Sequence, residues 1–361
     1  MRNTILLVAG FIFLLAGTSF AFHDGGVAHC NGCHTMHNSE DGQLVDPNSP
    51  TGNAWLLNDG TPSDVCLNCH SHGSYSVLGA DPLTPTAERG AGDFVFLLED
   101  NINDGHGGGD TLTDGSWANP IPGYKGGHSI IATGHGLDAD PTAFPGNTGP
   151  GGSYSKFNLG CSSCHDPHGN ENFRLLYGAG DIQDGLYTFV NAAPVAEGLS
   201  VFFGSEAMGM YTGYESGMSA WCGNCHAGMH TATAGGNLVH PSGVALNGTI
   251  ATAYGLYNGT DDMTGGDPAL SYIPEVAFEE VGRAVSSPVG PTASAQLSCI
   301  TCHRAHATSG PDIGRWDFNV TLLVEDGDES GSYVIPNPYS DNQRSLCNKC
   351  HGKDAGDHLP F

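Results

Sequence analysis

The chain has 361 residues, with 38 Asp and Glu against 11 Lys and Arg, which gives a formal net charge of −27. So acidic a surface disfavours nucleic acids and anionic lipids as partners and favours solubility. The chain also contains 54 glycines and 21 prolines but only 14% charged residues. This composition lacks the periodic apolar pattern of a large helical or sheet core, so we expect mostly irregular coil with tight turns.

Residues 1–21 have the pattern of a secretory signal peptide. Arg2 provides the positive charge, residues 5–16 are almost wholly apolar, and small residues precede the expected cleavage after Ala21. The apolar run is too short for a membrane anchor, and no later segment approaches the length of a membrane span. We therefore expect a secreted chain, residues 22–361, that folds as a single domain without membrane insertion.

The twelve cysteines all fall in six copies of the pattern Cys-x-x-Cys-His. The cysteine pairs are Cys30 and Cys33, Cys66 and Cys69, Cys161 and Cys164, Cys222 and Cys225, Cys299 and Cys302, and Cys347 and Cys350. The histidines directly after these pairs are His34, His70, His165, His226, His303 and His351. This pattern attaches haem c: both thiols form thioethers with the porphyrin, and the histidine binds one face of the iron. The sequence therefore predicts six covalently attached haems.

Disulfides and zinc ribbons are the competing interpretations of so many paired cysteines. Neither requires a histidine directly after the second cysteine, whereas all six pairs have one. Zinc ribbons also need knuckles about 15–20 residues apart, and here the first cysteines of successive pairs are 36 to 95 residues apart. The expected fold class is therefore a multihaem c-type cytochrome, with short helices at the haem motifs, irregular coil between them and a core formed by stacked haems.

The second face of each iron needs a distal ligand, and twelve further histidines are available. Methionine would raise the reduction potential, but three of the six methionines after the leader crowd between 208 and 218. Seven histidines are candidate distal ligands for the six positions: His23, His37, His128, His168, His230, His240 and His306. The other five are expected to be surface or turn residues: His29, His72, His106, His135 and His358.

Four of the seven candidates closely follow a motif histidine. The spacing is three residues for His37, His168 and His306, and four residues for His230. A histidine so near in sequence cannot reach the far face of the same haem, because the porphyrin lies between. It can reach the iron of a neighbouring haem, so we expect haems that complete one another in dovetailed pairs.

The other three candidates have local sequences that suit a ligand. His128 follows two glycines, which allow close approach of the backbone to a ring. His240 precedes a proline, which restricts it to extended geometry and stiffens its presentation. His23 would be the second residue of the mature chain, and ligation would hold an otherwise loose terminus in place. One of the seven candidates is in excess of the six positions.

The segments around the motifs resemble those of a known family. They are residues 22–27, 34–38, 66–70, 161–169, 217–222, 302–307 and 346–351, together with His240-Pro241. With these segments the chain is similar to the outer-membrane cytochrome S-like hexahaem cytochromes of metal-reducing bacteria, which polymerise into conductive extracellular filaments. The loops 79–157, 170–210 and 307–340 show no such similarity. The resemblance implies two histidines per iron, a continuous stack of haems, and one haem completed by a histidine of the neighbouring subunit, at the position of His37.

Two histidines on every iron would leave no open position for a substrate, so each haem could only gain and lose an electron. We expect extracellular electron transfer through a filament of copies of this chain. The expected partners are other multihaem cytochromes or outer-membrane conduits and extracellular acceptors such as metal oxides. Two alternatives stay open at this point: a multihaem reductase with one open haem, and a monomeric periplasmic electron shuttle that completes every haem internally.

Overall fold

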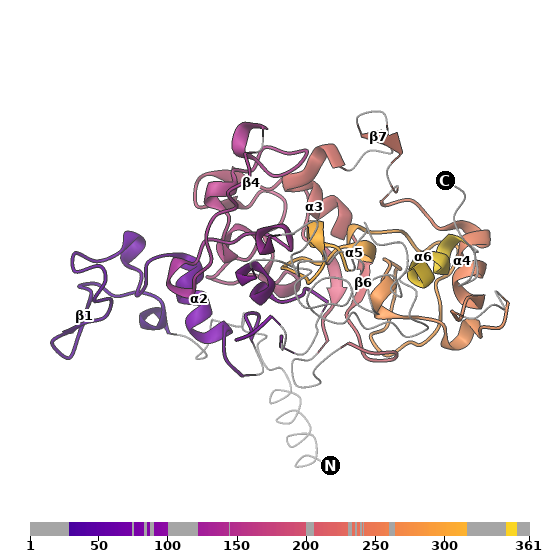
Figure 1. The fold of residues 1–361 in the computed structure, drawn as a ribbon, viewed down its shortest axis with the longest axis horizontal. Coiled ribbons are helices and arrows are strands. Elements are labelled where there is room, and N and C mark those ends of the chain that lie inside the picture. Colours follow the sequence, from indigo (N-terminus) through magenta and orange to yellow (C-terminus); the bar gives the residue numbers. More distant parts are fainter. Residues whose placement is uncertain are drawn as a thin grey trace, which may run out of the picture.

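The fold is seen in a computed structural model (Figure 1). It describes residues 29–73, 76–82, 85–86, 90–99, 122–143, 145–199, 206–229, 233–234, 237–238, 240, 242–259, 264–315 and 344–351. The predicted signal peptide, residues 1–21, lies outside these ranges. The described residues therefore include all six haem motifs.

The described chain is mostly irregular coil with short elements, which confirms the expectation from its composition. Its α-helices are α2 (Pro62–His70), α3 (Met218–His226), α4 (Asn247–Leu256), α5 (Cys299–Cys302) and α6 (Arg344–His351). Its strands pair antiparallel in twos: β1 (Ser39–Glu40) with β2 (Gln43–Leu44), β3 (Ile182–Gln183) with β4 (Tyr187–Thr188), β5 (Val195–Glu197) with β6 (Gly213–Ser216), and β7 (Thr233–Ala234) with β8 (Asn237–Leu238). Chain order roughly follows the long axis, from β1 and α2 at one end to α4 and α6 at the other (Figure 1).

The haem motifs adopt two local structures that alternate along the chain. The second, fourth and sixth motifs form the last turns of α2, α3 and α6, and each of these helices ends on the motif histidine. The first and third motifs begin short 3-10 turns, Cys30–Gly32 and Cys161–Ser163, and the fifth forms the single turn α5. The predicted short helices at the motifs are thus confirmed. Three of them are helices of eight or nine residues, and three are single turns.

Local capping explains where the longer motif helices begin. At α2 the hydroxyl of Thr61 accepts a hydrogen bond from the backbone N–H of Asp64, and Pro62 occupies the first turn, where its missing N–H costs nothing. At α3 the buried carboxylate of Glu279 accepts from the backbone N–H groups of Met218 (2.7 Å) and Ser219 (3.3 Å). An anion at a helix N-terminus is stabilised by the helix dipole.

The apolar core of the polypeptide is divided into separate clusters. The first contains the buried rings of Tyr211, Tyr254, Tyr272 and Phe278 and lies around α4 and α6. Motif cysteines pack at the edges of these clusters: Cys302 and Cys350 against the first, Cys161 against the second and Cys222 against the third. The clusters therefore meet the haem motifs, where attached porphyrins would add large apolar surfaces.

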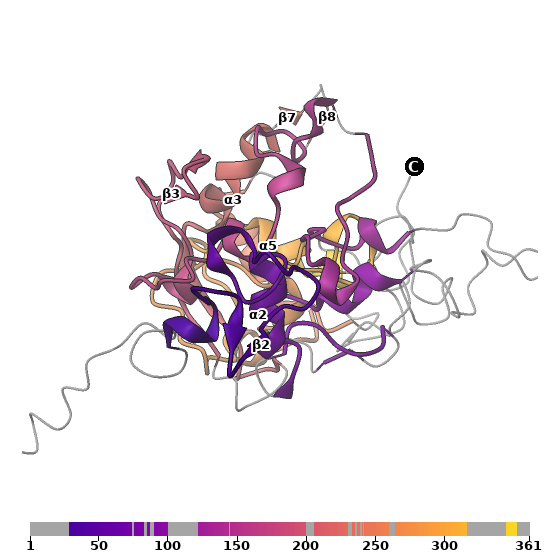
Figure 2. The same ribbon diagram turned by 90° about the vertical axis from the view of Figure 1, so that its left-hand side faces the viewer.

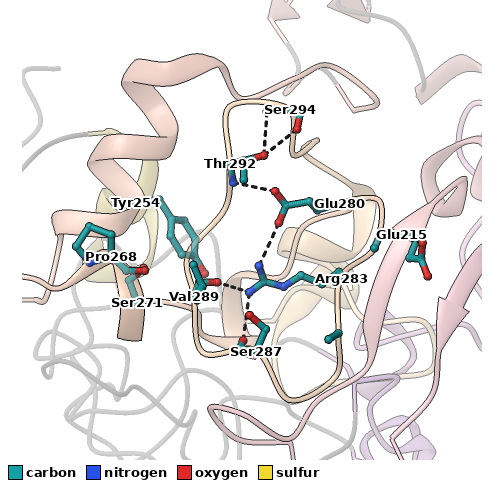
Figure 3. Close-up of polar contacts among 12 residues, drawn as sticks. Glu215, Tyr254, Pro268, Ser271, Glu280, Arg283, Ser287, Val289, Thr292 and Ser294 are labelled. Atoms are coloured by element: carbon teal, nitrogen blue, oxygen red, sulfur yellow. Dashed lines mark hydrogen bonds and ion pairs between the residues drawn. The ribbon is translucent and has the colours of Figure 1, made fainter.

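The buried Arg283 connects residues 280–289 to the rings of the first cluster. The guanidinium of Arg283 lies over the Tyr272 ring, 4.2 Å from its centroid, and forms an ion pair with Glu280 at 3.1 Å. It also donates to the carbonyls of Ser287 and Val289 (Figure 3). A guanidinium stacked on an aromatic ring and saturated with acceptors in this way stabilises a loop that has no regular structure.

Candidate haem sites

Four motif histidines lie opposite a histidine predicted to be a distal ligand. The pairs, with the distances between ring centroids, are His34 and His168 (6.4 Å), His165 and His306 (6.4 Å), His226 and His128 (6.0 Å), and His351 and His240 (6.0 Å). The two rings of a pair come from distant parts of the sequence. The fold therefore brings together one histidine of each kind at four separate places.

The remaining candidates are distributed differently. His37 is exposed, three residues beyond His34. His23 and His230 lie outside the described residues. Among the histidines expected not to be ligands, His72 is exposed and shares a hydrogen bond with the neighbouring Ser71 hydroxyl at 2.9 Å, as a surface residue would.

Hydrogen bonds to backbone carbonyls fix the tautomer of many of these histidines. The Nδ1 atoms donate to carbonyls as follows: His34 to Trp55 (3.0 Å), His165 to Arg174 (2.7 Å), His303 to Asp312 (3.1 Å), His226 to Pro150 (2.8 Å) and His128 to Ala305 (2.7 Å). Because a carbonyl can only accept, each Nδ1 carries the proton and Nε2 keeps its lone pair. Nε2 is then the atom available to bind iron, as in most metal sites where the other ring nitrogen is hydrogen-bonded.

Three of these carbonyls belong to left-handed turns that the sequence does not predict. The turn residues and their φ angles are Trp55 (53°) and Leu56 (58°), Arg174 (53°) and Leu175 (59°), and Asp312 (56°) and Ile313 (58°). None of the six is a glycine, and only Asp312 is of a type enriched at positive φ. The residue types therefore gave no signal for the turns.

Burial keeps several of the paired histidines neutral. It lowers the pKa of His306 to about 3 and also lowers the pKa values of His128 and His240. The neutral imidazole is the form that binds a metal ion, so no proton has to be displaced at neutral pH.

The motifs themselves approach one another in pairs at their first cysteines. The side chains of Cys66 and Cys161 are within hydrogen-bonding contact, and so are those of Cys222 and Cys299. In each pair, a serine three residues before the first of the two cysteines accepts a hydrogen bond from the backbone N–H of the second. The two bonds are Cys161 N–H to Ser63 (3.1 Å) and Cys299 N–H to Ser219 (3.0 Å). The second motif is thus fixed to the third, and the fourth to the fifth, by the same device.

A buried arginine beside the fifth motif indicates whether the residues around this motif fit a haem. Arg315 is 4% exposed, its backbone N–H donates to the carbonyl of Cys302 at 2.8 Å, and its Nε donates to Ile300 at 2.7 Å. Both terminal guanidinium nitrogens have no hydrogen-bond partner among the described residues. A guanidinium is always charged, and leaving it buried without an anion is costly. The two propionates of a haem attached to this motif are anions of the required kind, so the residues fit the group.

Two further features limit the kind of site. Within the ranges that the structure describes, no cluster of three or more His, Cys, Asp or Glu side chains is arranged to hold a bare metal ion. In the same ranges, no helix is long and apolar enough to cross a membrane.

Comparison with known proteins gives the family. No protein-family model matches the chain. It is 30% identical to the C-type cytochrome OmcS of Geobacter sulfurreducens over 98% of this chain and 99% of that protein. The fold matches the outer membrane cytochrome S filament from Geobacter sulfurreducens with a TM-score of 0.76 and the OmcS nanowires with a TM-score of 0.73. Both matches have 28% identity and cover 92% of this chain and 100% of the other. This similarity confirms the multihaem fold class and the six haem c groups, and the chain therefore belongs to the OmcS family of c-type cytochromes.

Proposed function

We propose that this cytochrome conducts electrons outside the cell through six haems, each held between two histidines, in a filament built from copies of the chain. The observation that carries the proposal is the set of four histidine pairs. Two imidazoles that bind one metal ion from opposite sides, each at about 2 Å, have ring centroids about 6 Å apart. The four pairs have separations of 6.0 to 6.4 Å, so each leaves room for one iron between its rings.

The role of the protein follows from this ligation. Haem supplies an iron that changes reversibly between its ferric and ferrous states. A histidine on each face prevents water, ligands and substrates from reaching the iron, so the site supports electron transfer without a catalysed reaction. This favours an electron carrier over a reductase with an open haem. The acidic surface keeps the secreted chain soluble, and we propose metal oxides and other multihaem cytochromes or outer-membrane conduits as its electron acceptors and donors.

A regular step along the chain points to the subunit contact. His168, three residues after the third motif histidine, lies opposite the first motif histidine, His34. His306, three residues after the fifth, lies opposite the third, His165. Each such histidine thus faces the motif two places earlier. The same step applied to His37, three residues after the first motif histidine, leads to the fifth motif of a neighbouring copy.

The position of His37 suits this role. The first and sixth motifs lie toward opposite ends of the molecule (Figure 1), and the view onto the first end shows α2 and β2 in front (Figure 2). His37 is exposed, and so are the apolar side chains of its neighbour Met36 (77%) and of Trp55 (65%), whose carbonyl accepts from the first motif histidine. Such a surface gains from burial against a second copy. We therefore propose that His37 completes the haem at His303 of the next subunit.

Intact-mass measurement of the purified protein tests the first part of the proposal. We expect six haem additions on a chain that begins at Phe22, because each Cys-x-x-Cys-His pattern attaches one haem. Five haems or fewer, or cysteines recovered as thiols or disulfides, would contradict it. Replacing Cys222 with Ala should loosen or remove one haem and leave five.

Electron paramagnetic resonance tests the histidine pairs. The rings of His34 and His168 are nearly parallel, at 5°, whereas those of His240 and His351 are at 73°. Parallel axial rings separate the energies of the iron d orbitals and give a rhombic low-spin signal, while nearly perpendicular rings give a highly anisotropic one. We therefore expect both classes of low-spin signal in the oxidised protein and no binding of carbon monoxide by the reduced protein. A stoichiometric high-spin haem in native filaments would instead favour the reductase.

A further inference from the structure

The three left-handed turns share one arrangement of backbone hydrogen bonds with the motifs they contact. At the third motif the bonds are His165 Nδ1–H to Arg174 O (2.7 Å), Asp166 N–H to Leu175 O (2.8 Å) and Tyr177 N–H to Cys164 O (3.1 Å). The first motif repeats them as His34 to Trp55 (3.0 Å), Thr35 to Leu56 (2.7 Å) and Asn58 to Cys33 (2.9 Å). The fifth repeats them as His303 to Asp312 (3.1 Å), Arg304 to Ile313 (2.9 Å) and Arg315 to Cys302 (2.8 Å).

The backbone conformation of these turns is unfavourable for the residues that adopt it. L-amino acids with a Cβ atom are strained at positive φ, and two such residues in succession are rare. Glycine would relieve the strain, yet the chain, which has 54 glycines, places none at the six positions. The turn is imposed from both sides by its bonds to the motif, because the backbone on either side of the motif histidine is paired with it.

The carbonyl of each turn accepts a hydrogen bond from the motif histidine that would bind the iron. It holds the Nδ1–H and so fixes the rotation of the imidazole about its bond to the chain. It also makes Nε2 a stronger electron donor, which stabilises ferric relative to ferrous iron and lowers the reduction potential. The fourth motif has a different turn: His226 donates to the carbonyl of Pro150 (2.8 Å), and the left-handed residue that follows, Gly151 (φ 70°), is a glycine whose carbonyl accepts from the N–H of Gly228 (2.7 Å).

We propose that the left-handed turns at residues 55–56, 174–175 and 312–313 are positioning elements for the axial histidines of the first, third and fifth haems. Each turn sets the orientation of one imidazole and keeps the potential of its haem low. The proposal rests on the bis-histidine ligation proposed above. It assigns a function to residues that act through a backbone carbonyl.

Proline and glycine at the second turn position separate this role from general packing. Proline fixes φ near −65° and removes the N–H that Leu175 donates to Asn172, at 3.0 Å, so Leu175→Pro forbids the turn. Leu175→Gly removes the same side chain but adopts positive φ without strain. We expect the proline variant to keep six low-spin haems and to show one midpoint potential shifted upward, with a changed low-spin signal. The glycine variant should leave all six potentials in place. At the fifth motif, Ile313→Pro should shift the potential of a different haem, and Ile313→Gly should not.

The outcomes separate this proposal from the proposed function. A high-spin haem at the third motif of the wild-type protein would contradict the proposed bis-histidine ligation itself. If wild-type haems are all low-spin and the potentials of the proline variants are unchanged, only the positioning role is wrong. Equal shifts in the glycine and proline variants would also overturn it, because packing would then be the cause. Should the proline variants not accumulate with six haems, hydrogen exchange in the wild type decides: rapid exchange of the Nδ1 protons at the odd haems would contradict the proposal.

Discussion

Replacing His37 with Ala should abolish filaments while all six haems stay attached. The substitution removes an imidazole proposed to bind the haem at His303 of the next subunit, and it changes neither cysteine of any motif. Each isolated chain should then contain one high-spin haem, visible in the optical and electron paramagnetic resonance spectra, and electron micrographs should show monomers or short oligomers. Free imidazole should restore the low-spin spectrum of that haem without restoring filaments, because it completes the iron but joins no subunits.

The matched control is His72→Ala, which removes another exposed histidine shortly after a haem motif. It should assemble into filaments of wild-type length with six low-spin haems. If His37→Ala does the same, His37 is a surface histidine. If His37→Ala stays monomeric with only low-spin haems, subunit contact depends on other residues and every haem is completed within one chain.

Replacing Glu279 with Leu should cause a large loss of stability. Glu279 is 3% exposed, and its carboxylate accepts from the N–H groups at the start of α3 and from the hydroxyl of Ser298 at 3.0 Å. Because α3 leads into the fourth motif and Ser298 precedes the fifth, one side chain holds both. Losing the acceptor leaves several buried donors unsatisfied, so we expect a loss of about 3 kcal/mol.

Thermal unfolding followed by circular dichroism in the haem absorption band would measure this effect. Glu279→Gln retains one acceptor oxygen and should lose less stability than Glu279→Leu. Glu197→Leu, at an exposed position on β5, should have little effect. An unfolding temperature for Glu279→Leu equal to that of the Glu197 variant would show that the carboxylate does not hold the two motifs together.

What could be predicted from the sequence depended on how local each feature is. Haem attachment needs five consecutive residues, so the six motifs can be identified directly in the sequence. The glycine and proline content and the spacing of the motifs predict irregular coil with short helices. The distal ligands depend on tertiary contacts. Spacing identified His168 and His306 as unable to serve their own haems, but only the fold places them opposite His34 and His165.

Other determinants left no sign in the sequence. The turn at Arg174 and Leu175 is built from residues that disfavour its backbone conformation, and its stability comes from bonds to a motif nine residues away. Glu279 and Arg315 look like ordinary surface charges until burial is known. These residues act through tertiary contacts, which neither composition nor periodicity records.

The proposed histidine pairs would also cross-link the chain through the iron. His34 and His168 are 134 residues apart in sequence, and His165 and His306 are 141 apart. With iron between the rings, each pair closes a long loop, as a cross-link does, and closing long loops removes the most entropy from the unfolded chain. The two loops overlap and the thioethers anchor both haems, so a cut in an exposed loop would leave the fragments joined. A protein with little apolar core can in this way resist proteases outside the cell.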